Sequence, residues 1–468
     1  MSHSLDVIII GAGTAGLTAL REVRKRSERF VIVNDGPYGT TCARTGCMPS
    51  KLLIEAANAF HRRLVFEEFG IRGGAALTAD IPAVLRRVRA LRDSFVGYTL
   101  QATEELGERS IAGRARLLGP NRIEVDGREL SADRIIIATG SRPIVPKPWL
   151  TFGDRVLTTD TLFEQADLGR RIAVVGMGAI GVEMAQALSR LGIEVTGFDS
   201  GHRLAGLTDE SVNATLGALL RQEFAIHCGS AAELFEAPDG IGIRSNEPHV
   251  VVDQVIAAIG RRPNIDGLGL ESLGVALDAH GMPPVDPHTM QIGDLPIFLA
   301  GDANGQLPLL HETADEGYIA GVNAFATKPV GFVRRPPLAI VFADPNVAVV
   351  GKRLSELDPA AIVSGAVDFD NQGRARAAQR NHGRICLYAD QRNGRLLGAE
   401  MCAPAGEHMA HLLALAIGRA LTVNDLLRMP FYHPVLEEGL RTALRRLAAQ
   451  LQTPAATELA VRDAQPPD

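Results

Sequence analysis

The sequence predicts an α/β protein with two parallel-sheet units, followed by a C-terminal region of antiparallel strands and helices. Apolar strand-like runs alternate with amphipathic helical stretches, which is typical of a parallel sheet covered by helices. A strand, a glycine turn and a helix are predicted from Asp6 onward and again over 171–192. From about Pro336 the runs IVFADPNVAVVG, GRICLYAD and RLLGAEMCA have the pattern of antiparallel strands, and helices follow them.

Composition excludes several classes of protein. The 468 residues include 48 Lys and Arg against 54 Asp and Glu, a net charge of −6 that excludes a broad basic surface for nucleic acid. No apolar run reaches the roughly 18 residues of a membrane span, and the N-terminus lacks the pattern of a secretory signal. Five cysteines are too few for a secreted disulfide scaffold. We therefore expect a cytoplasmic protein of about two to four domains, with no nucleic-acid or membrane partner.

Between the two units, a helix is predicted over 80–106, with Leu85, Val88, Leu91 and Leu100 on one face. Buried strands are predicted at 135–138 and within 294–305. The last residues, 456–468, lack periodicity and are predicted to be a loose tail.

The first glycine loop, Gly11-x-Gly13-x-x-Gly16, directly follows the apolar run 7–10. In a dinucleotide-binding turn the first glycine permits the tight turn, the second lets the backbone approach a pyrophosphate, and the third lets helix and strand pack closely. About 20 residues on, where an acidic residue usually contacts the ribose, the chain has Asn34. The strand-turn-helix context favours a dinucleotide site, and a turn that serves core packing alone is the alternative.

The second glycine loop is Gly176-x-Gly178-x-x-Gly181, and Asp199 closes the strand that follows. A carboxylate at that position accepts hydrogen bonds from ribose hydroxyls and repels a 2′-phosphate, which predicts NAD rather than NADP. The alternative is a solvated aspartate at a strand end. Two such units in one chain suggest two bound dinucleotides.

Cys42 and Cys47 lie shortly after the first unit. On a regular helix they would be about 7.5 Å apart along the axis, too far for a disulfide, so a bridge needs an opened turn, which Gly46 permits. Pro49 suits the first turn of a helix through Lys51, and a thiolate at its N-terminus would have a lowered pKa. The two cysteines could form a redox pair, bind a metal or be two unpaired thiols. No second Cys or His pair lies near, so we predict no metal site.

The segment GTTC-ARTG-CMPSK resembles the redox-active C-x4-C-x-P-S-K segment of the dihydrolipoamide dehydrogenase family, which belongs to the class I pyridine nucleotide-disulfide oxidoreductases. IIIATGSRP, AAIGRRPN, FLAGDANG and FYHPVLEEG extend the resemblance over nearly the whole chain. It implies a glutathione-reductase-like fold, with an FAD-binding domain at 1–145 and 265–335, an NAD-binding domain at 146–264, and a C-terminal α+β dimerisation domain at 336–455.

The resemblance implies FAD at the first loop and NAD at the second. The residues of the quoted motifs that it assigns to cofactor binding are Gly11, Gly13, Gly16, Asn34, Thr139, Gly140, Gly301, Asp302, Gly176, Gly178, Gly181, Asp199 and Gly260.

The resemblance also assigns catalytic roles. Cys47 would lie against the flavin as the charge-transfer thiolate, and Cys42 would exchange with the substrate. Lys51 is similar to the lysine that pairs with a glutamate near flavin N5, and Glu183 is similar to that glutamate.

His433 and Glu438 resemble the H-P-x-x-x-E signature of the family. The family implies that His433 is the acid/base of the partner subunit's site in a homodimer with shared active sites. The carboxylate could fix the tautomer of the imidazole and raise its basicity.

These implications predict that the chain oxidises a dihydrolipoyl-type dithiol, free or on a lipoyl domain, with NAD. The alternatives are an NAD(P)H-dependent reductase of another disulfide or electron acceptor, and a flavoprotein scaffold with a vestigial redox site. Asn34 departs from the ribose-binding glutamate of the family, and Ala43-Arg44-Thr45-Gly46 departs from its usual Leu-Asn-Val-Gly. Arg44 would lower the pKa of Cys42 if it faced the pair; the alternative is a surface arginine.

Overall fold

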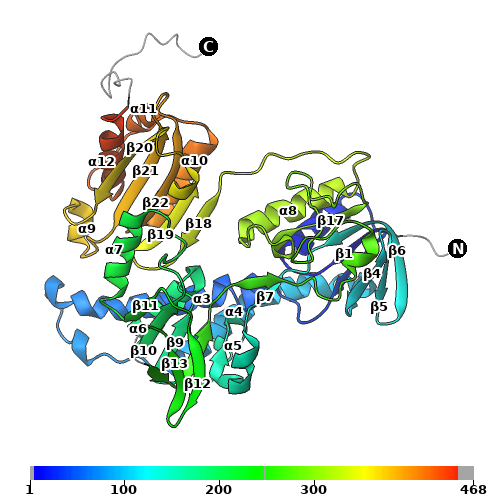
Figure 1. Ribbon diagram of the computed structural model, residues 1–468, viewed down its shortest axis with the longest axis horizontal. Helices are drawn as coiled ribbons and strands as arrows, with labels where there is room; N and C mark the ends of the chain where they lie inside the picture. The colour runs from blue at the N-terminus through cyan, green and yellow to red at the C-terminus, as the bar shows by residue number, and fades with distance from the viewer. Residues whose placement is uncertain (1–4, 247–248, 452–468) are drawn as a thin grey trace.

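The computed structural model describes residues 5–246 and 249–451, so the predicted tail at 456–468 lies outside the described residues. Figure 1 shows two sheet units with parallel strands, the first of which also has an antiparallel edge, and, at the C-terminal end, an antiparallel sheet with its own helices. This arrangement confirms the predicted α/β class with a C-terminal α+β region.

The first sheet has seven strands in the order β3-β2-β1-β6-β5-β4, with β17 beside β6. Strand β1 runs parallel to β2 and β6, with Ile9 opposite Ile32 and Ile136. All three side chains are fully buried, as expected for parallel strands covered on both faces. Helices α1 (Thr14–Arg24) and α8 (Leu310–Asn323) pack side by side on this sheet (Figure 1). The strands are β1 (Leu5–Ile10), β2 (Phe30–Asn34), β3 (Ser110–Ala112), β4 (Ala115–Gly119), β5 (Arg122–Val125), β6 (Arg128–Ile137) and β17 (Ile297–Leu299).

The second sheet has five parallel strands in the order β11-β10-β9-β15-β8. They are β8 (Val156–Leu157), β9 (Arg171–Val175), β10 (Glu194–Asp199), β11 (Ala225–Cys228) and β15 (Gln254–Ala257), with helices α5 (Thr159–Leu162), α6 (Ala179–Arg190) and α7 (Glu210–Leu220). An antiparallel sheet not predicted from the sequence is inserted here, formed by β12 (Glu233–Ala237), β13 (Gly240–Arg244) and β14 (Val250–Val252). The short strands β7 (Ser141–Pro143) and β16 (Arg261–Pro263) pair where the chain passes between the two units.

The cysteine segment forms helices α2 (Thr41–Arg44) and α3 (Cys47–His61), which pack against α4 (Ile81–Glu104). Asp80 caps α4 by accepting a hydrogen bond from the N–H of Ala83 at 2.9 Å. On the predicted face, Leu85 and Val88 are buried, Leu91 is half-buried and Leu100 is 37% exposed. The buried stripe continues through Val96 and Thr103 instead, which leaves Leu100 at its margin.

The C-terminal sheet is antiparallel in the order β18-β19-β22-β21-β20, formed by β18 (Leu338–Val341), β19 (Asn346–Gly351), β20 (Ile362–Asp368), β21 (Arg384–Asp390) and β22 (Leu396–Ala403). Both faces are buried. In β21, Ile385 and Leu387 pack in a core with α10 (Gly406–Gly418), α11 (Val423–Leu427) and α12 (Glu437–Ala448). Cys386 and Tyr388 face the other way, into a core shared with α6 and α7. Because alternate residues of β21 point to opposite faces, one face of this sheet packs on its own helices and the other packs against the second unit.

Glu400 on β22 also joins the two regions. Its side chain is fully buried, and it accepts backbone hydrogen bonds from Thr208 at 2.6 Å, Asp209 at 3.0 Å and Leu354 at 2.9 Å. Three N–H donors satisfy a buried carboxylate that would otherwise carry a large desolvation cost. Among the described residues, no helix is long and apolar enough to cross a membrane.

Candidate active site

Cys42 and Cys47 lie on either side of a break between two helices. Helix α2 ends at Arg44, and α3 begins at Cys47 with Gly46 as its N-cap. Both cysteines are free, and they are close enough for each thiol to shift the pKa of the other. The predicted opening at Gly46 therefore brings the pair together.

The surroundings favour a thiolate on Cys47 rather than on Cys42. The neighbouring Cys42 thiol, the charge of Lys51 and the Cys47 amide at the helix N-terminus together outweigh desolvation of the sulfur and lower the pKa of Cys47 to about 7, although the residue as a whole is exposed. The neighbouring Cys47 thiol, together with burial, raises the pKa of Cys42. The predicted lowering is confirmed in direction, but the neighbouring thiol is a larger cause than the helix end.

Lys51 and Glu183 form an ion pair beside the cysteines. The Nζ of Lys51 lies 2.9 and 2.8 Å from the two carboxylate oxygens of Glu183, which α6 contributes. Phe342, just beyond β18, donates its N–H to Glu183 Oε1 at 2.9 Å, and its ring centroid lies 4.6 Å from the Lys51 Nζ. The pair suggested by resemblance is thus in contact, and Phe342 is an addition that no sequence motif marked.

His433 and Glu438 form a second pair, at the start of α12. The Nδ1 of His433 lies 3.0 Å from Glu438 Oε1, and the N–H of Val435 donates to Oε2 at 3.2 Å. The hydrogen bond from His433 lowers the pKa of Glu438. With Nδ1 engaged and the side chain 81% exposed, the Nε2 atom faces outward.

The two pairs do not meet within one chain. In the described part of the chain, no hydrogen bond or ion pair joins His433 to Cys42, Cys47 or Lys51. Figure 1 shows α12 on the outer side of the C-terminal sheet, apart from α3. Within one chain the two pairs are therefore separate groups of residues.

The first glycine loop has the shape that a pyrophosphate requires. Gly11 has φ +107°, and a Cβ there would lie 2.2 Å from the carbonyl oxygen of Ala138. By contrast, nothing lies within 4 Å of the Cβ position of Gly13, the N-cap of α1, which has no side-chain cap. The side chain of Asn34 accepts a hydrogen bond from the N–H of Ala12 at 2.9 Å. The open backbone and the helix N-terminus fit a dinucleotide.

Thr139 and Asp302 extend this site. The Thr139 hydroxyl is buried and has no hydrogen-bond partner in the described structure, so it is free to bind a cofactor. Asp302 accepts hydrogen bonds from the hydroxyls of Ser141 at 2.7 Å and Thr313 at 3.1 Å. Together with the open loop, the orphaned hydroxyl and this carboxylate fit FAD.

A buried ion-pair cluster holds the segment around Asp302 and was not identified as part of the site from the sequence. Glu316 accepts hydrogen bonds from the N–H of Gly301 and the amide of Asn304, both at 2.7 Å. Arg334 bridges Glu312 at 2.6 Å and Glu316 at 2.9 Å. Burial raises the pKa of Glu316 despite these donors. Both glutamates lie in the segment LLHETADEG, residues 309–317, which begins α8.

The second loop repeats this geometry. Gly176 has φ +95°, and nothing lies within 4 Å of the Cβ position of Gly178. Asp199 accepts hydrogen bonds from the N–H of Met177 at 2.6 Å and of Gly201 at 2.8 Å. Gly260, with φ +112°, and Gly140, with φ +70°, lie in the connections between the two units. The loop fits a second dinucleotide.

Among the described residues, no hydrogen bond or ion pair joins Arg44 to Cys42 or Cys47. Its stem packs against Gly39, where a Cβ would lie 2.9 Å from the Arg44 Cδ. The cation that acts on Cys42 is Lys51. The expectation that Arg44 lowers the Cys42 pKa is therefore not supported by the contacts.

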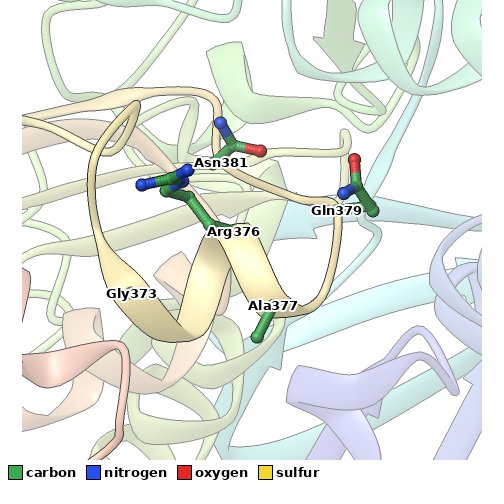
Figure 2. Close-up of a pocket in the computed structure, with 5 residues that line it drawn as sticks. All are labelled: Gly373, Arg376, Ala377, Gln379 and Asn381. Carbon is green, nitrogen blue, oxygen red and sulfur yellow. The ribbon is translucent and has the colours of Figure 1, made fainter. Parts of the chain in front are cut away.

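One hollow in the surface lies apart from the predicted site. A hollow of about 460 Å³ beside α9 (Gly373–Ala377) is lined by Gly373, Arg376, Ala377, Gln379 and Asn381 and contains none of the predicted residues (Figure 2). No group of three or more His, Cys, Asp or Glu side chains in the described ranges is arranged to hold a metal ion.

Comparisons with known proteins agree with this geometry. The family model described as pyridine nucleotide-disulphide oxidoreductase matches residues 5–317, and its dimerisation domain matches 338–444. The dihydrolipoyl dehydrogenase of Thermus scotoductus is 32% identical over 461 residues, covering 95% of this chain and 98% of that protein.

Two solved structures share the fold. LpdA from Mycobacterium tuberculosis has a TM-score of 0.82 at 25% identity, with 95% of this chain and 100% of that chain covered. The Cu(II) complex of the HOCl-induced flavoprotein disulfide reductase RclA from Escherichia coli has a TM-score of 0.83 at 21% identity, with 95% and 99% covered. Since the two family models together span almost all of the described residues, the chain belongs to the pyridine nucleotide-disulphide oxidoreductases and is an FAD-dependent disulfide oxidoreductase that uses a nicotinamide dinucleotide.

Proposed function

We propose that this chain is a dihydrolipoyl dehydrogenase, which oxidises a dihydrolipoyl dithiol, free or carried by a lipoyl domain, with NAD+. The observation that carries the proposal is the cysteine pair on either side of Gly46, in which Cys47 begins a helix one turn before Lys51 and Lys51 pairs with Glu183. The pKa of Cys47 is lowered there. The name of the Thermus scotoductus relative supports the same substrate class.

The two glycine loops would hold the cofactors. The first loop with Asn34, Thr139 and Asp302 would bind FAD, and the second loop with Asp199 would bind NAD. FAD would take the electron pair from the reduced cysteines and NAD+ would accept it as hydride. Domain boundaries at 1–145 with 265–335 (FAD), 146–264 (NAD) and 336–455 (dimerisation) follow from this assignment.

The cysteines would perform the exchange with the substrate. One substrate sulfur attacks Cys42 Sγ, the Cys42–Cys47 bond breaks, and Cys47 leaves as a thiolate. The second substrate sulfur then attacks the mixed disulfide, which releases the oxidised substrate and the Cys42 thiol. The substrate loses two electrons and two protons, and the enzyme disulfide gains the two electrons. Lys51 and the Cys47 amide at the start of α3 would stabilise the departing Cys47 thiolate, which makes Cys47 a good leaving group.

His433 would move the proton. Its Nε2 would take a proton from the substrate thiol, which is mostly protonated at neutral pH with a pKa of about 8.5. Glu438 would hold the ring through Nδ1 and stabilise the imidazolium. Because His433 does not meet the cysteines of its own chain, it would serve the partner subunit's site in a homodimer.

Substrate screening tests the proposal. We expect NAD+ reduction with dihydrolipoamide to have the highest kcat/KM among dihydrolipoamide, dihydrolipoate and, in the reverse direction with NADH, glutathione disulfide and mercuric ion. A higher value with another disulfide or electron acceptor would make the chain a reductase of that compound. No turnover with any of them would favour a vestigial site.

Serine substitutions test the roles of the cysteines. After two-electron reduction, long-wavelength absorbance should be lost in Cys47→Ser. It should be present in Cys42→Ser without any reductant, because the Cys47 thiolate is then permanently free. The reverse pattern would exchange the two roles.

Mixed dimers test the shared site. Subunits carrying Cys42→Ser and subunits carrying His433→Ala should each be inactive alone. A mixed dimer would contain one complete site and should recover about half of the activity of a dimer with two sites. No recovery after verified subunit exchange would place His433 outside the reaction.

A further inference from the structure

Phe342 reaches the redox helix from the C-terminal sheet. It lies in the turn between β18 and β19, and its N–H donates to Glu183 Oε1 at 2.9 Å. Its ring centroid is 4.6 Å from the Nζ of Lys51. One residue therefore contacts both members of the ion pair beside the cysteines.

The turn that carries Phe342 is fixed to α6 at two further points. The side-chain amide of Gln186 accepts from the N–H of Asp344 at 2.8 Å and donates to its carbonyl oxygen at 2.9 Å. Arg190, whose side chain is 4% exposed, donates to the Asp344 carboxylate at 3.0 Å. The turn is therefore held at Asp344 as well as at Phe342, which fixes the backbone position from which the ring extends.

Lys51 needs such a restraint. Its side chain is 30% exposed, so solvent is an alternative environment for the ammonium group. Lys51 is four residues after Cys47 on α3, which places both on the same face of the helix. An aromatic ring attracts an ammonium group to its face, and the carboxylate of Glu183 attracts it from another side. Together they keep the positive charge next to Cys47.

We propose that Phe342 is a positioning residue of the redox site, whose ring and amide hold the Lys51–Glu183 pair against the Cys47 thiol. This deepens the proposed function, since it rests on Cys47 being the reactive thiolate. The C-terminal region then contributes twice to catalysis: His433 acts in the partner subunit's site, and Phe342 acts in the site of its own chain.

The test is the rate at which iodoacetamide alkylates Cys47 in the reduced holoenzyme, measured against pH and assigned by peptide mapping. The groups that act on Cys47 are Cys42, Lys51 and Glu183. Phe342→Leu keeps the backbone N–H but removes the ring. We expect it to raise the midpoint of the alkylation rate against pH by about half a pH unit. At a pH below that midpoint, roughly threefold less Cys47 is then present as thiolate. Phe342→Tyr keeps the ring and should restore the wild-type midpoint.

Matched variants separate positioning from packing. Val341→Ala removes a buried side chain next to Phe342 and should lower the melting temperature without moving the midpoint. Phe342→Met, measured in parallel, fills a similar volume without a ring and should behave like Phe342→Leu. With Lys51→Ala already present, Phe342→Leu should have no further effect on the midpoint, because the cation is gone.

An unchanged midpoint in both ringless variants would overturn the proposal, as would an equal shift in Val341→Ala. Alkylation requires no dithiol substrate. An enzyme that fails to oxidise dihydrolipoamide would therefore refute the proposed function while still showing whether Phe342 positions Lys51.

Discussion

The two glycine loops have the same backbone mechanics. Gly11 and Gly176 both have positive φ, and a Cβ at either would lie 2.2 or 2.4 Å from a carbonyl oxygen of the returning strand. At the third glycine of each loop, a Cβ would lie 1.9 or 1.7 Å from the carbonyl oxygen of the first. At the middle glycine nothing lies within 4 Å. The first and third glycines are therefore required by the fold, and the middle one leaves open space at the helix N-terminus.

The loops differ in the residue that ends the next strand. Asn34 accepts from the loop and donates its amide to the carbonyl oxygen of Gly36 at 2.9 Å. Asp199 accepts from the loop too, but its second oxygen accepts from the N–H of Gly201 at 2.8 Å. The turn after β2 thus offers a hydrogen-bond acceptor, the carbonyl oxygen of Gly36, whereas the turn after β10 offers a donor, the N–H of Gly201. The two residues are matched to their turns and cannot simply be exchanged.

The largest difference is expected between the third and the middle glycine of the first loop. Gly16→Ala places a Cβ 1.9 Å from a backbone oxygen, so we expect loss of bound flavin together with several kcal/mol of stability. In Gly13→Ala the added Cβ meets no protein atom, so the variant should fold normally. It should nevertheless bind less flavin, because the Cβ takes up space that a pyrophosphate needs. The flavin-to-protein absorbance ratio and the melting temperature check both variants.

The same pair in the second loop is the control. Gly181→Ala and Gly178→Ala should retain flavin, because FAD is assigned to the other loop. They should raise the KM for NAD+, and only Gly181→Ala should lower the melting temperature. Flavin loss in Gly178→Ala would contradict the assignment of one cofactor to each loop.

A smaller effect is expected for the preference for NAD over NADP. We expect the wild type to have the higher kcat/KM with NAD+, because the Asp199 carboxylate would face the 2′-phosphate. Two like charges about 4 Å apart repel by about 1–4 kcal/mol between bulk water and a protein surface, so the preference should be at least severalfold. Asp199→Asn removes the charge while keeping the hydrogen bond from Met177 available. This variant should reduce the ratio of kcat/KM for NAD+ to kcat/KM for NADP+.

The ratio of the two kcat/KM values is the quantity to compare. Asp199→Asn also weakens the contact with Gly201, but that loss affects both dinucleotides equally and cancels in the ratio. Asp199→Ala removes both contacts and should give a similar ratio at lower absolute rates. Equal use of NAD+ and NADP+ by the wild type would contradict the role of the carboxylate.

Local signals made much of the fold predictable. A buried strand, a glycine turn and a helix are adjacent in sequence, so both dinucleotide units and the break at Gly46 could be identified from residue order. The antiparallel C-terminal strands could also be predicted, because each strand is a continuous apolar run in the sequence. The stripe on α4 was predicted less well, since which helix face is buried depends on neighbours far away in the chain.

The supporting residues of the site could not be predicted, because their partners are distant in sequence. Phe342 contacts Glu183 across 159 residues, and Glu400 contacts Thr208 across 192. Neither contact has a sequence spacing or periodicity that would reveal it. The Lys51–Glu183 pair, 132 residues apart, was expected only through resemblance to a family.

The smallest expected effect concerns Asn34→Asp. A carboxylate would bring this position closer to the acidic residue usual in such units, and a charge-assisted hydrogen bond to a ribose would favour it. The turn argues against that gain. The Asn34 amide donates to the Gly36 oxygen at 2.9 Å. A carboxylate oxygen there would face another acceptor, at a cost of about 1–3 kcal/mol, against a gain of about 1 kcal/mol when a charged acceptor replaces a neutral one at the ribose.

We therefore expect Asn34→Asp to lower the melting temperature of the flavin-loaded enzyme by a few degrees, roughly 2–4 °C per kcal/mol for a domain of this size. Asn34→Ala loses both hydrogen bonds without adding a repulsive contact, so it separates the two causes. If repulsion at Gly36 dominates, the aspartate variant should be no more stable than the alanine variant. A higher melting temperature for Asn34→Asp than for the wild type would show that the charge at the ribose outweighs the turn, and that Asn34 and Asp199 are interchangeable after all.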